Sequence, residues 1–165
     1  MFAPKPISLD SVPGALAKAE RYRLLNEPHE AESICLDILG VDPGNQQALV
    51  SLILALTDQI PDSSRAYPEA LARVKQLSTD YERAYYEGIV WERRAKARFT
   101  GGHGAHEYVY DWLAKALELY SEAEQLRPHG NDDALLRWNA CCRFLQEHRE
   151  LTPRQNEVAE PLLLE

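Results

Sequence analysis

Helical periodicity runs along most of the chain, and this feature restricts the possible folds more than any other. Apolar residues recur at steps of three and four positions, the spacing that places them on one face of an α-helix. Segments with the strict alternation of a half-buried strand are scarce. An all-α fold is therefore expected. The pattern predicts seven helices, at about residues 12–26, 28–40, 45–60, 66–78, 80–99, 106–127 and 131–148.

Short segments rich in turn-forming residues separate these helices. One such segment occupies residues 42–45, and others occupy 61–64 and 127–131. Pro28 stands where a proline is favoured, in the first turn of a helix. Because short connections make consecutive helices antiparallel neighbours, the sequence predicts stacked helical hairpins.

The helical pattern divides the chain into three parts. Residues 1–11 carry Pro4 and Pro6, and we expect them to form an extended N-terminal arm. Residues 12–148 form the expected helical domain, and residues 149–165 form a C-terminal segment.

The C-terminal segment combines a predicted short helix with an apolar end. Thr152 and Pro153 provide a cap and a first helical residue, and Pro161 prevents the helix from continuing. Three consecutive leucines follow at 162–164. Exposed leucines of this kind are an aggregation hazard. We therefore expect them to dock on the same molecule, on a partner, or on a second copy in a homodimer.

The composition excludes several classes of partner and compartment. Asp and Glu outnumber Lys and Arg by 26 to 18, and the resulting net charge of -8 argues against nucleic acid and anionic membrane surfaces as partners. No apolar run reaches the roughly 18 residues that span a bilayer, and the N-terminus lacks a secretory signal pattern. Cys35, Cys141 and Cys142 show no CxxC spacing, so we expect reduced thiols in a cytoplasmic protein.

Two stretches of the helical domain share one spacing of residues. Ala31, Cys35, Ile38 and Pro43 have the same relative offsets as Ala116, Tyr120, Ala123 and Pro128. Upstream of the first set, Tyr22 lies nine residues before Ala31, and Ala19 lies three residues before Tyr22.

This pattern resembles the tetratricopeptide repeat (TPR), in which small residues let two helices approach closely and a proline ends the second helix. The resemblance implies a solenoid of three TPR-like units and a capping helix. The second unit is degenerate. The third, with Gly88 and Trp91 at its small and aromatic positions, is elongated by about 16 residues.

The resemblance also implies a peptide-binding groove lined by the first helix of each unit. Carried over position by position, its lining is expected to be Leu16, Glu20, Arg23, Val50, Leu54, Asp58, Tyr85, Ile89, Glu92, Arg93, Trp138 and Cys142. Family members that grip a free carboxylate carry Lys or Arg and then Asn in their first unit. This chain has Leu16 and Glu20 there, so the resemblance does not imply such a clamp.

Signatures of enzymes and metal sites are missing from the sequence. There is no GxSxG motif, no phosphate-binding glycine loop and no dinucleotide fingerprint, so we expect neither catalysis nor a cofactor. His103 and His106 lie in a Gly/His-rich loop at 100–106, and Glu107 follows it. A metal site needs three or four converging ligands, so we expect no metal there. The loop is either a functional tip or a spacer.

These features together predict a non-enzymatic adaptor or scaffold that binds a peptide or protein segment in a helical groove. Two alternatives remain open at this stage. One is a secretion-type chaperone, and the other is a structural subunit that self-associates through the groove or the C-terminal segment.

Overall fold

The computed structural model describes residues 2–101 and 105–154. Within these residues all regular secondary structure is helical, which confirms the predicted all-α class. The elements are η1 (Leu9–Ser11), α1 (Val12–Leu24), α2 (Pro28–Val41), α3 (Gln46–Asp58), α4 (Ala66–Val74), α5 (Asp80–Thr100), η2 (Ala105–Tyr108), α6 (Val109–Leu126) and α7 (Asp133–Glu147).

The α-helix bounds differ from the predicted ones by at most four residues. The largest difference is at α4, which ends at Val74 because the chain turns directly after it. In the C-terminal segment, residues 152–154 are not helical. The remainder of the predicted tail helix, the leucines at 162–164 and His103 lie outside the described residues.

Local hydrogen bonds and backbone conformation explain several helix ends. At the start of α3, the Ala48 backbone N–H donates to the Asn45 side chain (2.9 Å). At the start of α5, the Glu82 backbone N–H donates to the Thr79 hydroxyl (3.1 Å). Asn26 follows α1 with a φ of 60°, a left-handed conformation that asparagine tolerates and that a helix cannot continue through.

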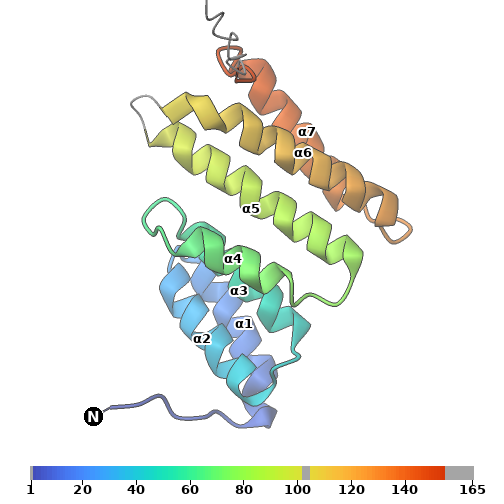
Figure 1. Ribbon diagram of the computed structural model, residues 1–165. Coiled ribbons are helices and arrows are strands. Elements are labelled where there is room, and N and C mark those ends of the chain that lie inside the picture. The colour runs from blue at the N-terminus through green and yellow to red at the C-terminus, as the bar shows by residue number, and fades with distance from the viewer. Residues whose placement is uncertain (1, 102–104, 155–165) are drawn as a thin grey trace, which may run out of the picture.

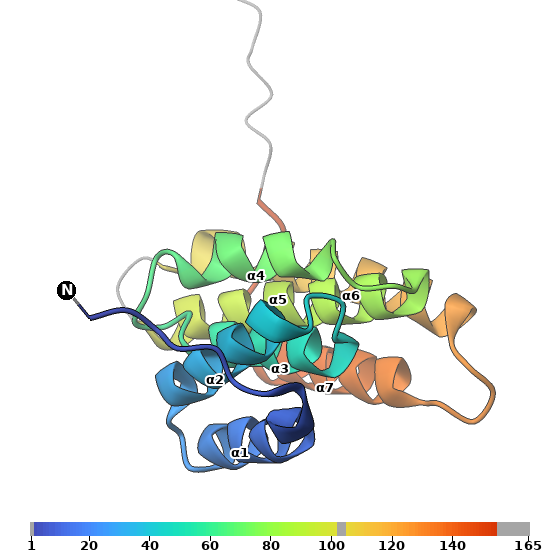
Figure 2. The ribbon, with the colours of Figure 1, turned by 90° about the horizontal axis from the view of Figure 1, so that it is seen from below.

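The helices pack in chain order, and α1, α3 and α5 also form a row of their own. Each α-helix contacts the next along the chain, α1 also contacts α3, and α3 contacts α5. Figure 1 shows α5 and α6 as a long antiparallel pair, with α1–α4 on one side and α7 on the other. Figure 2 shows the same arrangement from below, with α1 at one edge. The row of α1, α3 and α5 therefore joins the two halves of the molecule.

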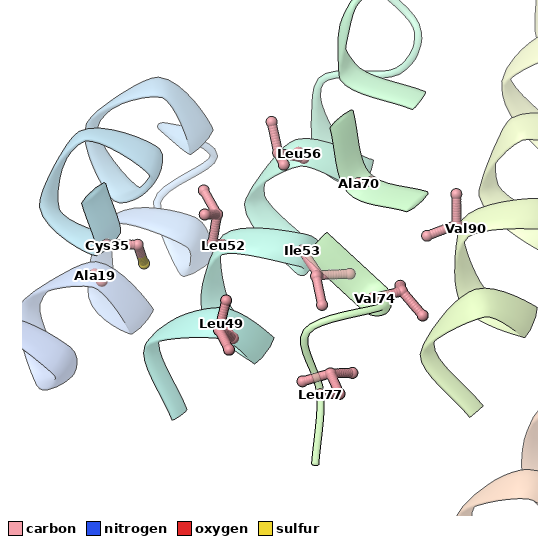
Figure 3. Close-up of a cluster of buried hydrophobic side chains, with 10 residues drawn as sticks. All are labelled: Ala19, Cys35, Leu49, Leu52, Ile53, Leu56, Ala70, Val74, Leu77 and Val90. Atoms are coloured by element: carbon pink, nitrogen blue, oxygen red, sulfur yellow. The ribbon is translucent and has the colours of Figure 1, made fainter. Parts of the chain in front are cut away.

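Two large clusters of buried side chains form the core, and α5 contributes to both. The first cluster combines residues of α1–α4 with Val90 of α5 (Figure 3). The second combines Ile89 of α5 with Leu113 and Tyr120 of α6 and Cys141 of α7. Because neighbouring residues of α5 enter different clusters, this helix is covered on two sides.

Gly88 lies where α5 and α6 approach closely. A Cβ atom added at Gly88 would lie 2.6 Å from Cε1 of Tyr120, a distance that real Cβ contacts do not reach. Alanines occupy other small-residue positions of the repeat pattern, and Ala19, Ala31 and Ala116 are completely buried. Small side chains are therefore buried at these positions of the pattern.

Candidate binding groove

A groove with a volume of about 560 Å³ opens across the row of α1, α3 and α5. Five of the residues predicted from the resemblance line it. From α1 these are Leu16, Glu20 and Arg23, and from α3 they are Val50 and Leu54. The remaining lining residues are Ala17, Gln46, Gln47, Ser51, Glu82 and Tyr86.

The groove combines an apolar floor with carboxylates. Leu16, Val50, Leu54 and Tyr86 are half-buried and pack against the core, so their outer surfaces form the floor. Burial raises the pKa of Tyr86 to about 12, so its hydroxyl stays neutral at physiological pH and can donate a hydrogen bond. Glu20 is exposed on α1 and makes no ion pair with another described residue.

A triad of charged side chains closes one end of the groove and unites three of the predicted residues. The Arg23 Nε donates to Oδ2 of Asp58 (2.9 Å), and Arg93 pairs with Oδ1 of the same carboxylate. These side chains come from α1, α3 and α5, and each keeps between 20% and 27% of its surface exposed. The triad therefore ties the row together and partly neutralises both arginines.

A smaller hollow of about 320 Å³ lies beyond this triad. Asp58 and Arg93 line it together with Lys96 of α5 and Asn26 of the α1–α2 turn. Lys96 is paired with Glu92, and Asp58 partly neutralises the two arginines of the triad. Within the groove, Glu20 lies one helical turn before Arg23, and Glu82 lies in the first turn of α5.

Of the other seven predicted residues, Asp58 and Arg93 form the triad at the end of the groove, and five lie away from the groove. Ile89 and Glu92 are 2% and 1% exposed, so the expectation that they face a bound peptide is wrong in this structure. The physical reason is that both point into the contact between α5 and the helices that follow it. Tyr85 and Trp138 are half-buried against the second core cluster. Cys142, half-buried on α7, also lies away from the groove residues.

Glu92 instead forms the centre of a buried polar network. The Tyr120 hydroxyl donates to its Oε2 (2.6 Å), Lys96 Nζ donates to its Oε1 (2.6 Å), and Arg137 lies 3.6 Å away. Burial and the adjacent Glu92 carboxylate raise the pKa of Tyr120 far above its ordinary value. The network joins α5, α6 and α7, which assigns Glu92 a structural role.

Sequence reasoning placed α5 in the groove but missed the two residues of α5 that line it, although a signal was present. Arg93 reaches the triad, and residues seven and eleven positions before it share its helical stripe. Those residues are Tyr86 and Glu82, both of which line the groove. The stripe through Arg93 therefore identifies the lining of α5 better than the carried-over positions 85 and 89.

The cysteines differ in their environment. Cys35 and Cys141 are buried, and burial raises the pKa of both thiols to about 12. Cys142 is half-buried. No group of three or more His, Cys, Asp or Glu side chains among residues 2–101 and 105–154 is arranged to hold a metal ion.

We expect one thiol of the native protein to react rapidly with a thiol reagent at pH 8, and all three to react in denaturant. Thiolate is the reactive species, so a pKa of about 12 combined with burial protects Cys35 and Cys141. Replacing Cys142 by serine should remove the rapid reaction. Rapid modification of two or three thiols in the folded protein would contradict the buried placement of Cys35 and Cys141.

Comparison with known proteins identifies no matching family model, curated protein or solved structure. No helix within the described part of the chain is long and apolar enough to cross a bilayer. What the groove binds must therefore follow from its own chemistry: an apolar floor, the unpaired carboxylate of Glu20 among the described residues, and the paired triad of Arg23, Asp58 and Arg93 at one end.

Proposed function

We propose that this chain is a non-enzymatic adaptor that binds a segment of another protein in the groove across α1, α3 and α5. In this proposal, α1–α2, α3–α4 and α5–α6 are TPR-like hairpins, and α7 is the capping helix. The observation that carries it is the single groove that brings together five lining residues predicted independently of the structure. The buried alanines at the small-residue positions support the repeat register.

The groove chemistry favours a partner segment with an apolar anchor and a basic neighbour. Apolar side chains of the partner would cover the half-buried floor, where removal from water drives association. A lysine or arginine of the partner would meet Glu20, whose charge is not balanced by an arginine of the described chain. We place this function in the cytoplasm, where three cysteines without a disulfide are expected.

The test is a matched pair of alanine-to-arginine substitutions. Ala17 is an exposed groove residue, and Ala72 is an exposed residue of α4 that lines none of the hollows described above. Both variants add one long cationic side chain to an exposed helical position. Ala17→Arg should reduce the proteins retained from a lysate by at least about fivefold, whereas Ala72→Arg should leave them unchanged. Equal retention by both variants would show that the groove is not the binding surface.

The molar mass of the purified protein in solution separates the adaptor from a self-associating subunit. The adaptor is supported if the protein is a monomer and if Ala17→Arg reduces the proteins that it retains from a lysate. A dimer that Ala17→Arg converts to a monomer would instead identify a second copy as the occupant of the groove.

A further inference from the structure

Another hollow, of about 300 Å³, lies between the α3–α4 turn, the C-terminal half of α5 and the beginning of α6, and it shares Pro61 and Ala97 with the hollow beyond the triad. Its walls include Ile60 and Pro61 from the turn, Ala97 from α5 and Trp112 from α6. Among the described residues, the charged side chains that line it are Arg94 and Arg98. A protein with a net charge of -8 thus has a small hollow whose described charged residues are both arginines.

Arg94 is held in place by aromatic rings on both sides. Its guanidinium carbon lies 3.8 Å from the centre of the Tyr67 ring and 3.9 Å from that of Trp112. Tyr108 stacks on Trp112 with ring centres 5.7 Å apart, which extends the stack. Because the N–H groups of a guanidinium lie in its plane, the rings leave its edge as the direction for an acceptor. The cation is therefore pre-oriented before any ligand arrives.

The four cationic side chains in the C-terminal half of α5 differ in their ion pairs with described residues. Arg93 is paired with Asp58, and Lys96 is paired with Glu92. By contrast, neither Arg94 nor Arg98 forms an ion pair with a carboxylate of the described residues. Arg98 is exposed and lies one helical turn after Arg94, so both can reach one ligand. Of these four cations, the two that form no ion pair with a described carboxylate are the two that line the hollow.

We propose that this hollow binds a small organic anion, in which a carboxylate or phosphate group carries a compact apolar body. The anionic group would accept hydrogen bonds from Arg94 and Arg98, as guanidinium groups favour. The apolar body would rest on Ile60, Pro61 and Ala97. A volume near 300 Å³ is at the lower end of the range for ligand sites, which fits a body of one ring. This site is independent of the groove and of its proposed function.

The probe is phenylphosphate, titrated into the full chain by calorimetry. We expect saturable binding with one site per chain, and Arg98→Gln should weaken it about tenfold, the loss expected for one charge-assisted hydrogen bond. Arg143→Gln is the matched control, because Arg143 is exposed on α7 and does not line the hollow. The substitution removes the same charge as Arg98→Gln, but outside the proposed site. That variant should bind within about twofold of the natural chain.

Three further titrations define the ligand. Benzylamine should not bind, inorganic phosphate should bind at least about tenfold more weakly than phenylphosphate, and benzoate should show whether a carboxylate serves as well as a phosphate.

Ala97→Leu, which fills the apolar wall and keeps both arginines, should abolish phenylphosphate binding. No binding of either aromatic anion, or unchanged binding by Arg98→Gln and Ala97→Leu, would overturn the proposal. Equal affinity for inorganic phosphate would overturn the assignment of an apolar body.

Discussion

Replacing Glu92 by alanine should lower the free energy of unfolding by about 3–5 kcal/mol, the usual cost of removing one partner of a buried ion pair. Glu92 is 1% exposed and accepts hydrogen bonds from Tyr120 and Lys96, with Arg137 also close. Without the carboxylate, the buried Tyr120 hydroxyl loses its acceptor and Arg137 loses its neutralising charge. Urea denaturation of the two proteins measures the difference.

Glu124→Ala is the control for this prediction. Glu124 pairs with Arg127 at 3.6 Å, but 43% of its side chain is exposed. Water screens such a pair, so its loss should cost at most about 1 kcal/mol. If both substitutions destabilise the protein equally, the Glu92 network is not the buried support described above.

Replacing Gly88 by alanine should lower the free energy of unfolding by about 1–3 kcal/mol, the range for overpacking a core. The added methyl group would meet the Tyr120 ring at 2.6 Å. Although a ring end can often move, Tyr120 is 1% exposed and its hydroxyl is bonded to Glu92, so it has little room to shift. Relief of the clash must therefore separate α5 from α6.

Gly40→Ala provides a control of opposite sign. Gly40 lies within α2, is exposed, and has no neighbour within 4 Å of the Cβ position. Alanine favours the helical backbone over glycine by up to about 1 kcal/mol, so this variant should be slightly more stable. Stabilisation by both substitutions would show that α5 and α6 do not approach as closely at Gly88 as the structure has it.

The helices were predictable from the sequence because their determinants are local. Periodic apolar residues define each buried face, and residues such as Pro28 and Asn45 act within one turn of the helix end that they define. The small-residue positions were predictable for a related reason. The resemblance to the repeat implied small residues at helix contacts at Ala31 and Ala116, and both are completely buried.

The site was only partly predictable, because side-chain direction on α5 depends on distant helices. α5 is covered on two sides, so apolar and charged residues occur around most of its circumference and do not identify one groove face. Ile89 and Glu92 were misplaced for that reason. The Arg94 stack had no local signal at all, since Tyr67 and Trp112 belong to α4 and α6 and meet only through tertiary packing.

The position of α1 at the edge of the fold has a dynamic consequence. Val12 and Ala19 are its only fully buried residues, so α1 has little apolar burial to oppose its detachment from the other helices. Its opening would remove Leu16 and Glu20, and with them one wall of the groove. An occupant of the groove would consequently hold α1 closed and slow amide hydrogen exchange across residues 12–24 in proportion to its concentration over its dissociation constant. Closure of α1 and occupancy of the groove are thus thermodynamically coupled.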